Sequence, residues 1–261
     1  IVTFILTFFL LEHPFSFLPS DQGRAFAVNG SLSKGKLRGV GFIFVLCFLI
    51  SSVLFLPLDV EYVIYGILLF AMMISGYLDD ASKTPWNEYK KGLIDLVISV
   101  VAVLTYMNFN STTICFGADE IVIPKALFLI LGVILIWVSV NVTNCTDGVD
   151  GLCASLCSVT LLAFGVLFAS VLQKYAMANF LFLSVLFAYL YFNSSPSSML
   201  MGDAGSRALG FYIAVIALKS THPFIYILLA AVMIVDGGIG LVKIALKRFL
   251  KISILKKTRT P

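Results

Sequence analysis

Residues 126–151 read ALFLILGVILIWVSVNVTNCTDGVDG, an apolar run that ends abruptly in a polar segment. A second apolar run, LCASLCSVTLLAFGVLFASVL, begins at Leu152. A helix needs about 20 consecutive, mostly apolar residues to cross the hydrocarbon core of a bilayer, and both runs come close to that length. The stretch therefore predicts two membrane-spanning helices joined by a loop rich in Asn, Asp and Gly.

Such runs recur along the whole chain of 261 residues, of which 60% are hydrophobic and 12% charged. Backbone polar groups inside a bilayer must be satisfied within the chain, so these runs are expected to be helices. The sequence predicts an all-α, polytopic membrane protein with one transmembrane domain over residues 1–261 and no signal peptide. The nine predicted spans are 1–11, 40–58, 60–78, 92–108, 124–141, 152–172, 175–192, 208–219 and 224–246.

Lysine and arginine are distributed unevenly between the two ends of these spans. If the N-terminus lies outside, 15 of the 18 basic residues fall on the inner side, and only Lys125, Lys174 and Lys219 fall outside. The positive-inside rule favours this orientation. A basic inner side also matches an anionic leaflet and anionic substrates, so the charge requires no nucleic acid.

Four polar segments fall on the predicted inner side, although they are far apart in the chain. They read SDQGRAFAVNGSLSKGKLRGVG, GYLDDASK, NVTNCTDGVDG and FNSSPSSMLMGDAGSRALG. Segments that face one compartment at similar depth can share a cleft. The sequence therefore predicts one functional site on the cytoplasmic face.

Three acidic residues in these segments stand out. Asp79 and Asp80 end the third predicted span, where adjacent side chains diverge by about 100° and can both reach one cleft. Asp203 lies between Gly202 and Gly205, in a backbone tight enough to approach a ligand. A solvated helix end would also explain the aspartate pair, and a simple turn would also explain Asp203.

The segment after the fifth predicted span has a regular polar spacing. Asn141, Asn144 and Asp147 are three residues apart and share one face if the segment is helical. Asp150 continues the spacing, and Gly148 lets the backbone approach a ligand. An ordinary polar loop does not require this spacing, which therefore favours a binding surface.

The types of residue present indicate the chemistry. Oxygen-only ligands favour Mg²⁺ or Mn²⁺ over zinc, and the sequence has two histidines and no HExxH or CxxC motif. Mg²⁺ bound by one or two carboxylates commonly handles phosphates. Six nearby basic residues could offset the charge of a diphosphate, although each alone also fits a topology marker: Lys34, Lys36, Arg38, Lys83, Lys90 and Lys91.

The motifs GYLDDASK, NVTNCTDGVDGL and MGDAGSRALG together resemble the polyprenyl-phosphate N-acetylhexosamine-1-phosphate transferases, from about Asp21 to the C-terminus. The resemblance implies Mg²⁺-dependent transfer of a phospho-sugar from a UDP-sugar to undecaprenyl phosphate, with release of UMP. It also implies a ten-helix bundle, a homodimer, contact with membrane lipids and a place in the bacterial inner membrane. The family's His-rich loop and tenth helix are expected to follow Pro261.

Two substrate branches of the family remain open at this point. The ending TRTP favours the branch that uses UDP-MurNAc-pentapeptide and makes lipid I for peptidoglycan. The branch that uses UDP-N-acetylglucosamine is the alternative.

The resemblance also assigns roles to single residues. It implies that one of Asp79 and Asp80 deprotonates the lipid phosphate. Phosphate is already largely ionised near neutral pH, so we favour charge positioning by the pair over obligatory base catalysis. Leu200 stands where the family carries an aromatic residue that stacks on uracil, which weakens the expected nucleotide affinity. The implied catalytic residues are Asp79, Asp80, Asn144, Asp147 and Asp203, with Asp203 as metal ligand and Asp79 and Asp80 as further candidate ligands. The implied substrate-binding residues are Lys34, Lys91, Asn141, Gly148, Val149, Asp150, Asn193 and Leu200.

A membrane transporter is the competing hypothesis from another class of protein. Asp95 and Asp236 lie near or within predicted spans, where ionisable residues often mark ion pathways. A transporter would also show acids near the bilayer midplane and two similar halves, whereas the motif acids lie at one face. We therefore expect these two residues to make hydrogen bonds between helices.

Overall fold

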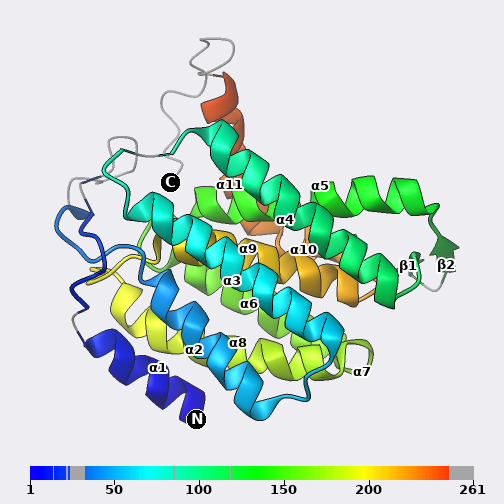
Figure 1. Cartoon of the computed structure of the whole chain (residues 1–261), viewed down its shortest axis with the longest axis horizontal. Coiled ribbons are helices and arrows are strands. Elements are labelled where there is room, and N and C mark those ends of the chain that lie inside the picture. The colour runs from blue at the N-terminus through cyan, green and yellow to red at the C-terminus, as the bar shows by residue number, and fades with distance from the viewer. Residues whose placement is uncertain (14, 22, 24–32, 85, 118, 247–261) are drawn as a thin grey trace.

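The computed structural model describes residues 1–13, 15–21, 23, 33–84, 86–117 and 119–246. The basic stretch 247–261 lies outside the described residues. Figure 1 shows a bundle of helices with a small hairpin at one end. The elements are α1 (Val2–Glu12), α2 (Gly41–Phe55), α3 (Val60–Asp80), α4 (Glu88–Phe109), β1 (Thr113–Phe116), β2 (Asp119–Val122), α5 (Lys125–Thr146), α6 (Leu152–Leu167), α7 (Ala169–Leu172), α8 (Lys174–Asn193), α9 (Gly202–Lys219), α10 (Ile225–Leu229) and α11 (Ala231–Ala245).

Several helices have the length and apolar composition of membrane-spanning helices. Among the described residues, α3, α4, α5 and α8 are long and apolar enough to cross one, and α1, α2 and α6 are shorter apolar helices. Many large apolar side chains on these helices are exposed, as expected where lipid replaces water. These features support the predicted helical, multi-pass membrane protein.

Helix α9 lies at the centre of the bundle, and every residue from Gly202 to Leu218 is buried. Its neighbours approach it closely through glycine. A Cβ atom on Gly76 of α3 would lie 2.3 Å from the Asp203 carbonyl oxygen, and one on Gly210 would lie 2.7 Å from the Ser139 carbonyl oxygen of α5. Small residues of this kind let helix backbones approach each other closely in membranes.

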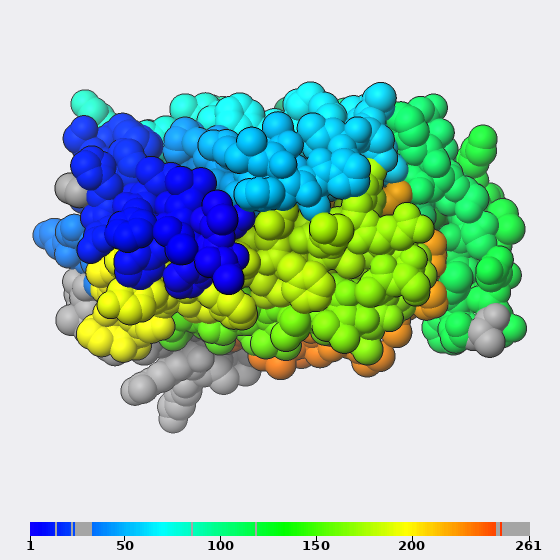
Figure 2. Space-filling view, turned by 90° about the horizontal axis from the view of Figure 1, so that it is seen from below, coloured from blue at the N-terminus to red at the C-terminus, as the bar shows by residue number. Residues whose placement is uncertain are grey.

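The first helix packs along the side of the bundle. Figure 2 shows α1, in blue, lying against the end of α8, in yellow, and beside α2, in light blue. The Phe8 ring lies 5.1 Å from both the Tyr191 and the Phe192 rings of α8. The described part of the loop after α1 then leads toward the end of the bundle that holds the polar segments.

The ends of several helices gather at one end of the bundle (Figure 1). The carboxyl ends of α3, α5 and α8 and the amino ends of α4, α6 and α9 lie there, opposite the hairpin. Hydrogen bonds join these ends across long stretches of chain, such as Gly41 N–H to the Met201 carbonyl and Gly151 N–H to the Asn193 side chain. The described parts of the four polar segments thus meet in one region.

The structure differs from the predicted elements in four details. Helix α5 runs to Thr146 rather than to 141, so Asn141 and Asn144 are helical rather than part of a loop. Helix α9 begins at Gly202 rather than at 208, and its first residues are buried although their sequence is polar. The predicted span 152–172 is broken at Phe168 into α6 and α7, and the chain turns into α8 through Gln173 at φ 47°. The predicted span 224–246 is broken at Ala230 into α10 and α11.

The all-α prediction is also wrong in one detail, since β1 and β2 form an antiparallel hairpin. Ile114 pairs with Ile121, and Gly117 takes the positive φ of 64° that the turn requires. The hairpin is tied to the bundle by a hydrogen bond from Cys115 N–H to the Thr221 carbonyl, 2.8 Å long.

Candidate functional site

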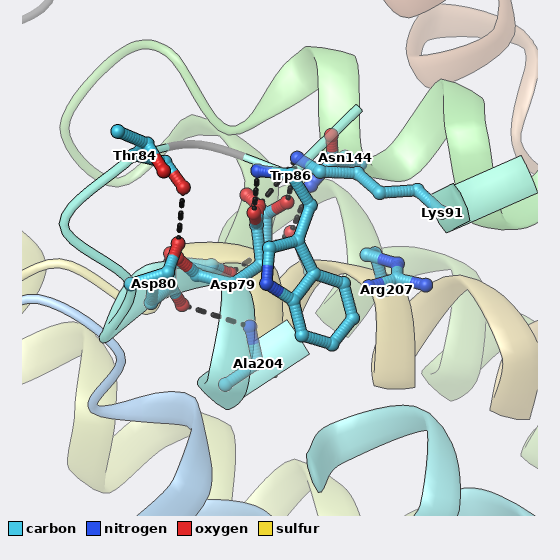
Figure 3. Close-up of polar contacts among 12 residues, drawn as sticks. Asp79, Asp80, Thr84, Trp86, Lys91, Asn144, Ala204 and Arg207 are labelled. Carbon is cyan, nitrogen blue, oxygen red and sulfur yellow. Dashed lines mark hydrogen bonds and ion pairs between the residues drawn. The ribbon is translucent and has the colours of Figure 1, made fainter. Parts of the chain in front are cut away.

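The site begins where the carboxyl end of α3 meets the amino end of α9. The Asp80 carboxylate accepts a hydrogen bond from Ala204 N–H at 3.1 Å (Figure 3). The first N–H groups of a helix have no partner inside it and carry partial positive charge. Asp80 therefore caps α9 from another helix, and this contact fixes the two ends against each other.

A lysine joins two of the predicted acids. The Lys91 ammonium forms ion pairs with Asp79 and with Asp203, the latter at 3.0 Å. Asp79 is held in place by the backbone N–H of Trp86, which donates to its carboxylate at 2.6 Å. Two carboxylates, one from α3 and one from α9, thus converge on the Lys91 ammonium.

Arg38 is the second cation of the cluster, and it contacts three carboxylates. Its guanidinium lies 2.8 Å from Asp80, 3.3 Å from Asp21 and 3.5 Å from Asp203. Burial lowers the pKa of Arg38, but the carboxylates of Asp80, Asp203 and Asp21 outweigh burial and raise it above its ordinary value. Arg38 therefore stays charged at any working pH.

Asp21 is a site residue that sequence reasoning missed. It is 3% exposed, and Ser33 Oγ and Gly23 N–H donate to its carboxylate beside the Arg38 contact. The only available signal was its position at the start of the first polar segment. Its contacts orient Arg38 toward the other two carboxylates.

A second polar group lies beside this cluster, in the loop between α5 and α6. The Asp150 carboxylate accepts hydrogen bonds from Ser197 N–H at 2.9 Å and from Ser197 Oγ at 2.8 Å. Lys36 Nζ lies 3.7 Å from Asp150 and donates to Ser197 Oγ at 2.8 Å. Asn193 accepts from Gly151 N–H at 3.0 Å and donates to the Met199 carbonyl at 2.9 Å.

The segment that carries Lys36 and Arg38 connects the two groups. Leu37 pairs with Ser20 on one side and with Met199 on the other. Leu200 N–H donates to the Leu37 carbonyl at 2.8 Å, and the Leu200 side chain is buried. Leu200 thus contributes its backbone to the site, and its side chain lies in the core.

The other predicted residues differ in whether they interact with α9 or Arg38. Asn144 donates to Ser206 Oγ of α9 at 3.0 Å, and the Asp147 charge acts on Arg38. Asn141 donates to the Trp137 carbonyl of its own helix, 2.8 Å away. Val149 and Lys34 are exposed, and Gly148 N–H donates to the Thr146 carbonyl.

The metal prediction can be compared with the donors present. Within the described ranges, no group of three or more His, Cys, Asp or Glu side chains could hold a metal ion. Mg²⁺ usually takes one or two carboxylates and completes its shell with water and substrate phosphate. Asp79 and Asp203 meet that requirement, because both already face one cation, the Lys91 ammonium. The donor set therefore fits a divalent ion if Lys91 moves aside.

We expect Gly202→Ala to damage the site at its centre. Gly202 has φ 67°, and an added Cβ would lie 2.3 Å from Asp80 Oδ2. The change should displace Asp80 from the amino end of α9 and lower the activity that depends on this site at least about tenfold, since small displacements in such sites are costly. Gly238→Ala is the matched control, because a Cβ there meets nothing within 4 Å. Equal activity in the two variants would contradict the role given to this close contact.

Comparisons with known proteins show the family to which the chain belongs. The family described as Glycosyl transferase family 4 matches residues 62–221, a range that includes Asp79, Asp80 and Asp203. The chain belongs to glycosyl transferase family 4, and it is a transferase.

The relatives of this chain carry the name of one particular kind of transferase. The phospho-N-acetylmuramoyl-pentapeptide-transferases of two Treponema pallidum strains, Nichols among them, are each 36% identical to it over 280 residues, covering 99% of this chain and 77% of theirs. The enzyme of the same name from Wolinella succinogenes is 29% identical over 242 residues, covering 81% of this chain and 68% of its own.

Proposed function

We propose that the chain transfers phospho-MurNAc-pentapeptide from UDP-MurNAc-pentapeptide to undecaprenyl phosphate, giving lipid I and UMP in peptidoglycan synthesis. The observation that carries the proposal is a group of four carboxylates and two cations where the ends of apolar helices meet. Such a site can handle a water-soluble diphosphate and a lipid phosphate at the same surface. The names of the relatives supply the particular sugar.

The proposed setting is the inner membrane of a bacterium. We place the N-terminus outside, nine spans in this chain of a ten-helix bundle, and the site on the cytoplasmic face. The uneven distribution of lysine and arginine supports the orientation. We also propose that the chain acts as a single transmembrane catalytic domain within a homodimer.

The proposed roles follow from charge. In the net reaction a lipid phosphate oxygen bonds to the sugar-bearing phosphorus, and the bond from that phosphorus to the UMP oxygen breaks. Arg38 and Lys91 can move from the carboxylates to the diphosphate and offset its charge. Asp203, with Asp79 or Asp80, would hold Mg²⁺, or Mn²⁺ in its place, which supplies further positive charge to the phosphates. Asn144 and Asp147 would line the same cleft.

We place the uridine near Asp150, Asn193 and the Gly148–Val149 backbone, which lie beside the carboxylate cluster. Lys36, which contacts Asp150, links this region to Arg38 two residues later. Asn141 and Lys34 lie at the margin of the proposed cleft.

Uridine affinity is expected to be constant from about pH 5 to 8 in the wild type. Burial raises the pKa of Asp150, but hydrogen bonds from Ser197 and the charge of Lys36 outweigh it, so the pKa lies below its ordinary value of about 3.9. Because its pKa is lowered, Asp150 stays ionised and keeps these contacts at every pH above the ordinary pKa. The contacts are lost only when the pH falls through the lowered pKa. Asp150→Asn should weaken uridine binding across the whole range, as measured by calorimetry. A transition in wild-type affinity between pH 5 and 7 would refute the assignment.

The function is tested by measuring UMP release with undecaprenyl phosphate and each of two donors. We expect release from UDP-MurNAc-pentapeptide and little from UDP-N-acetylglucosamine. The reverse preference would assign the chain to the other branch. No release from either donor, in protein that is folded, would remove the proposed reaction and leave the transporter hypothesis.

A further inference from the structure

Two ion pairs join α4 and α9, one above the other. Lys91 of α4 pairs with Asp203 of α9 at 3.0 Å, and one turn deeper Asp95 of α4 pairs with Arg207 of α9. Residues four apart lie on the same face of a helix. The signs therefore alternate both along each helix and between the helices, and we call these four residues the charge ladder. Figure 3 labels its two cations, Lys91 and Arg207.

The inner pair of the charge ladder is deeply buried. Asp95 and Arg207 side chains are each only 2% exposed. In the part of the chain that the structure describes, Arg207 Nε and Nη1 have no hydrogen-bond partner. A buried guanidinium with two unused donors would gain from a second carboxylate, and the charge of Arg207 already acts on Asp203.

We infer that Asp95 is a positioning residue that holds Arg207 on the inner pair and so keeps it from neutralising Asp203. The inference rests on the proposed function, because in that reaction Asp203 would bind a divalent ion. In this structure Asp203 pairs with Lys91 and Arg38, which can both move to the diphosphate, whereas the buried Arg207 would stay on Asp203. Asp95 itself touches neither reactant.

The charge ladder predicts opposite results for its two inner members. Without the Asp95 charge, Arg207 loses its ion pair and turns to the Asp203 carboxylate, which then binds a divalent ion poorly. Without Arg207, nothing new competes for Asp203, and the unpaired Asp95 draws Lys91 inward. Divalent binding should then stay the same or become tighter. A purely structural ion pair predicts equal damage, since breaking a buried pair from either side is destabilising.

The experiment is a Mn²⁺ titration of the substrate-free protein in nanodiscs, followed by electron paramagnetic resonance. We expect Asp95→Asn to weaken Mn²⁺ binding at least about tenfold, a loss of roughly 1.4 kcal/mol, and Arg207→Met to leave it unchanged or tighter. The double variant Asp95→Leu with Arg207→Leu removes both buried charges and should restore binding to within about threefold. Melting temperatures of all four proteins show whether each variant is folded.

The outcomes separate the inference from the function. Equal weakening in both single variants, or no weakening in Asp95→Asn, overturns the inference, as does a wild type that binds no Mn²⁺. If UMP release from the wild type is intact in those cases, the proposed function stands without this role for Asp95. If the binding order is as expected but no UMP is released, the proposed function fails alone.

Discussion

Asp203→Ala is expected to reduce UMP release from UDP-MurNAc-pentapeptide by at least about 10²- to 10³-fold, the usual loss when one preorganised electrostatic partner is removed. Asp203 contacts both cations of the site, Lys91 at 3.0 Å and Arg38 at 3.5 Å. Its removal takes away the proposed metal ligand and frees both cations to pair with the remaining aspartates.

Two further variants serve as comparison and control for Asp203→Ala. Asp203→Asn keeps the volume of the side chain and loses only the charge, so it should be nearly as inactive as the alanine variant. Asp119→Ala removes an exposed acid from the hairpin at the far end of the bundle and should leave release unchanged. Full activity in Asp203→Asn would show that the carboxylate charge is not used, and the metal assignment would fall.

Arg38→Met should lower UMP release by about 100-fold or more, and Arg38→Lys should recover only part of that loss. The Arg38 guanidinium faces Asp21, Asp80 and Asp203 at once, and a lysine ammonium cannot reproduce the planar fork that makes these contacts. Without the guanidinium, three carboxylates face one another with less positive charge to balance them. The turnover number and KM for UDP-MurNAc-pentapeptide measure the effect.

The control for Arg38 is Lys125, a basic residue next to the hairpin at the other end of the bundle. Lys125→Met makes the same change of charge at an exposed position and should alter turnover less than about threefold, as expected for a screened surface charge. Equal losses in Lys125→Met and Arg38→Met would show that the net charge of the protein matters rather than the contacts of Arg38. Wild-type activity in Arg38→Met would exclude Arg38 from the proposed mechanism.

Much of the fold could be predicted because hydropathy registers long apolar helices. The runs that became α3, α4, α5 and α8 were recognisable from length and composition. The start of α9 was not, because Gly202 and Asp203 are polar or small in sequence yet buried in the structure. The breaks at Phe168 and Ala230 lie inside apolar sequence, so hydropathy gives no sign of them.

The candidate site was predictable where its residues form motifs and hidden where they do not. Asp79, Asp80 and Asp203 stood out because acids are rare in so apolar a chain. Arg38 was seen only as one of many basic residues on the inner side, and its special position depends on Asp21. That position arises when Leu37 pairs with two distant segments, and pairing between remote segments leaves no periodic trace in the sequence.

The bond from Ala204 N–H to Asp80 joins residues 124 positions apart, and this separation constrains how the protein is made. While the ribosome is still producing the helices before α9, Asp80 lacks its partner on that helix. Helix α9 must then enter between α3 and α5, where backbones touch at Gly76 and Gly210 and leave no room for larger side chains. The nascent chain therefore lacks the assembled site until α9 has been inserted. A translation product that ends before α9 cannot form the site.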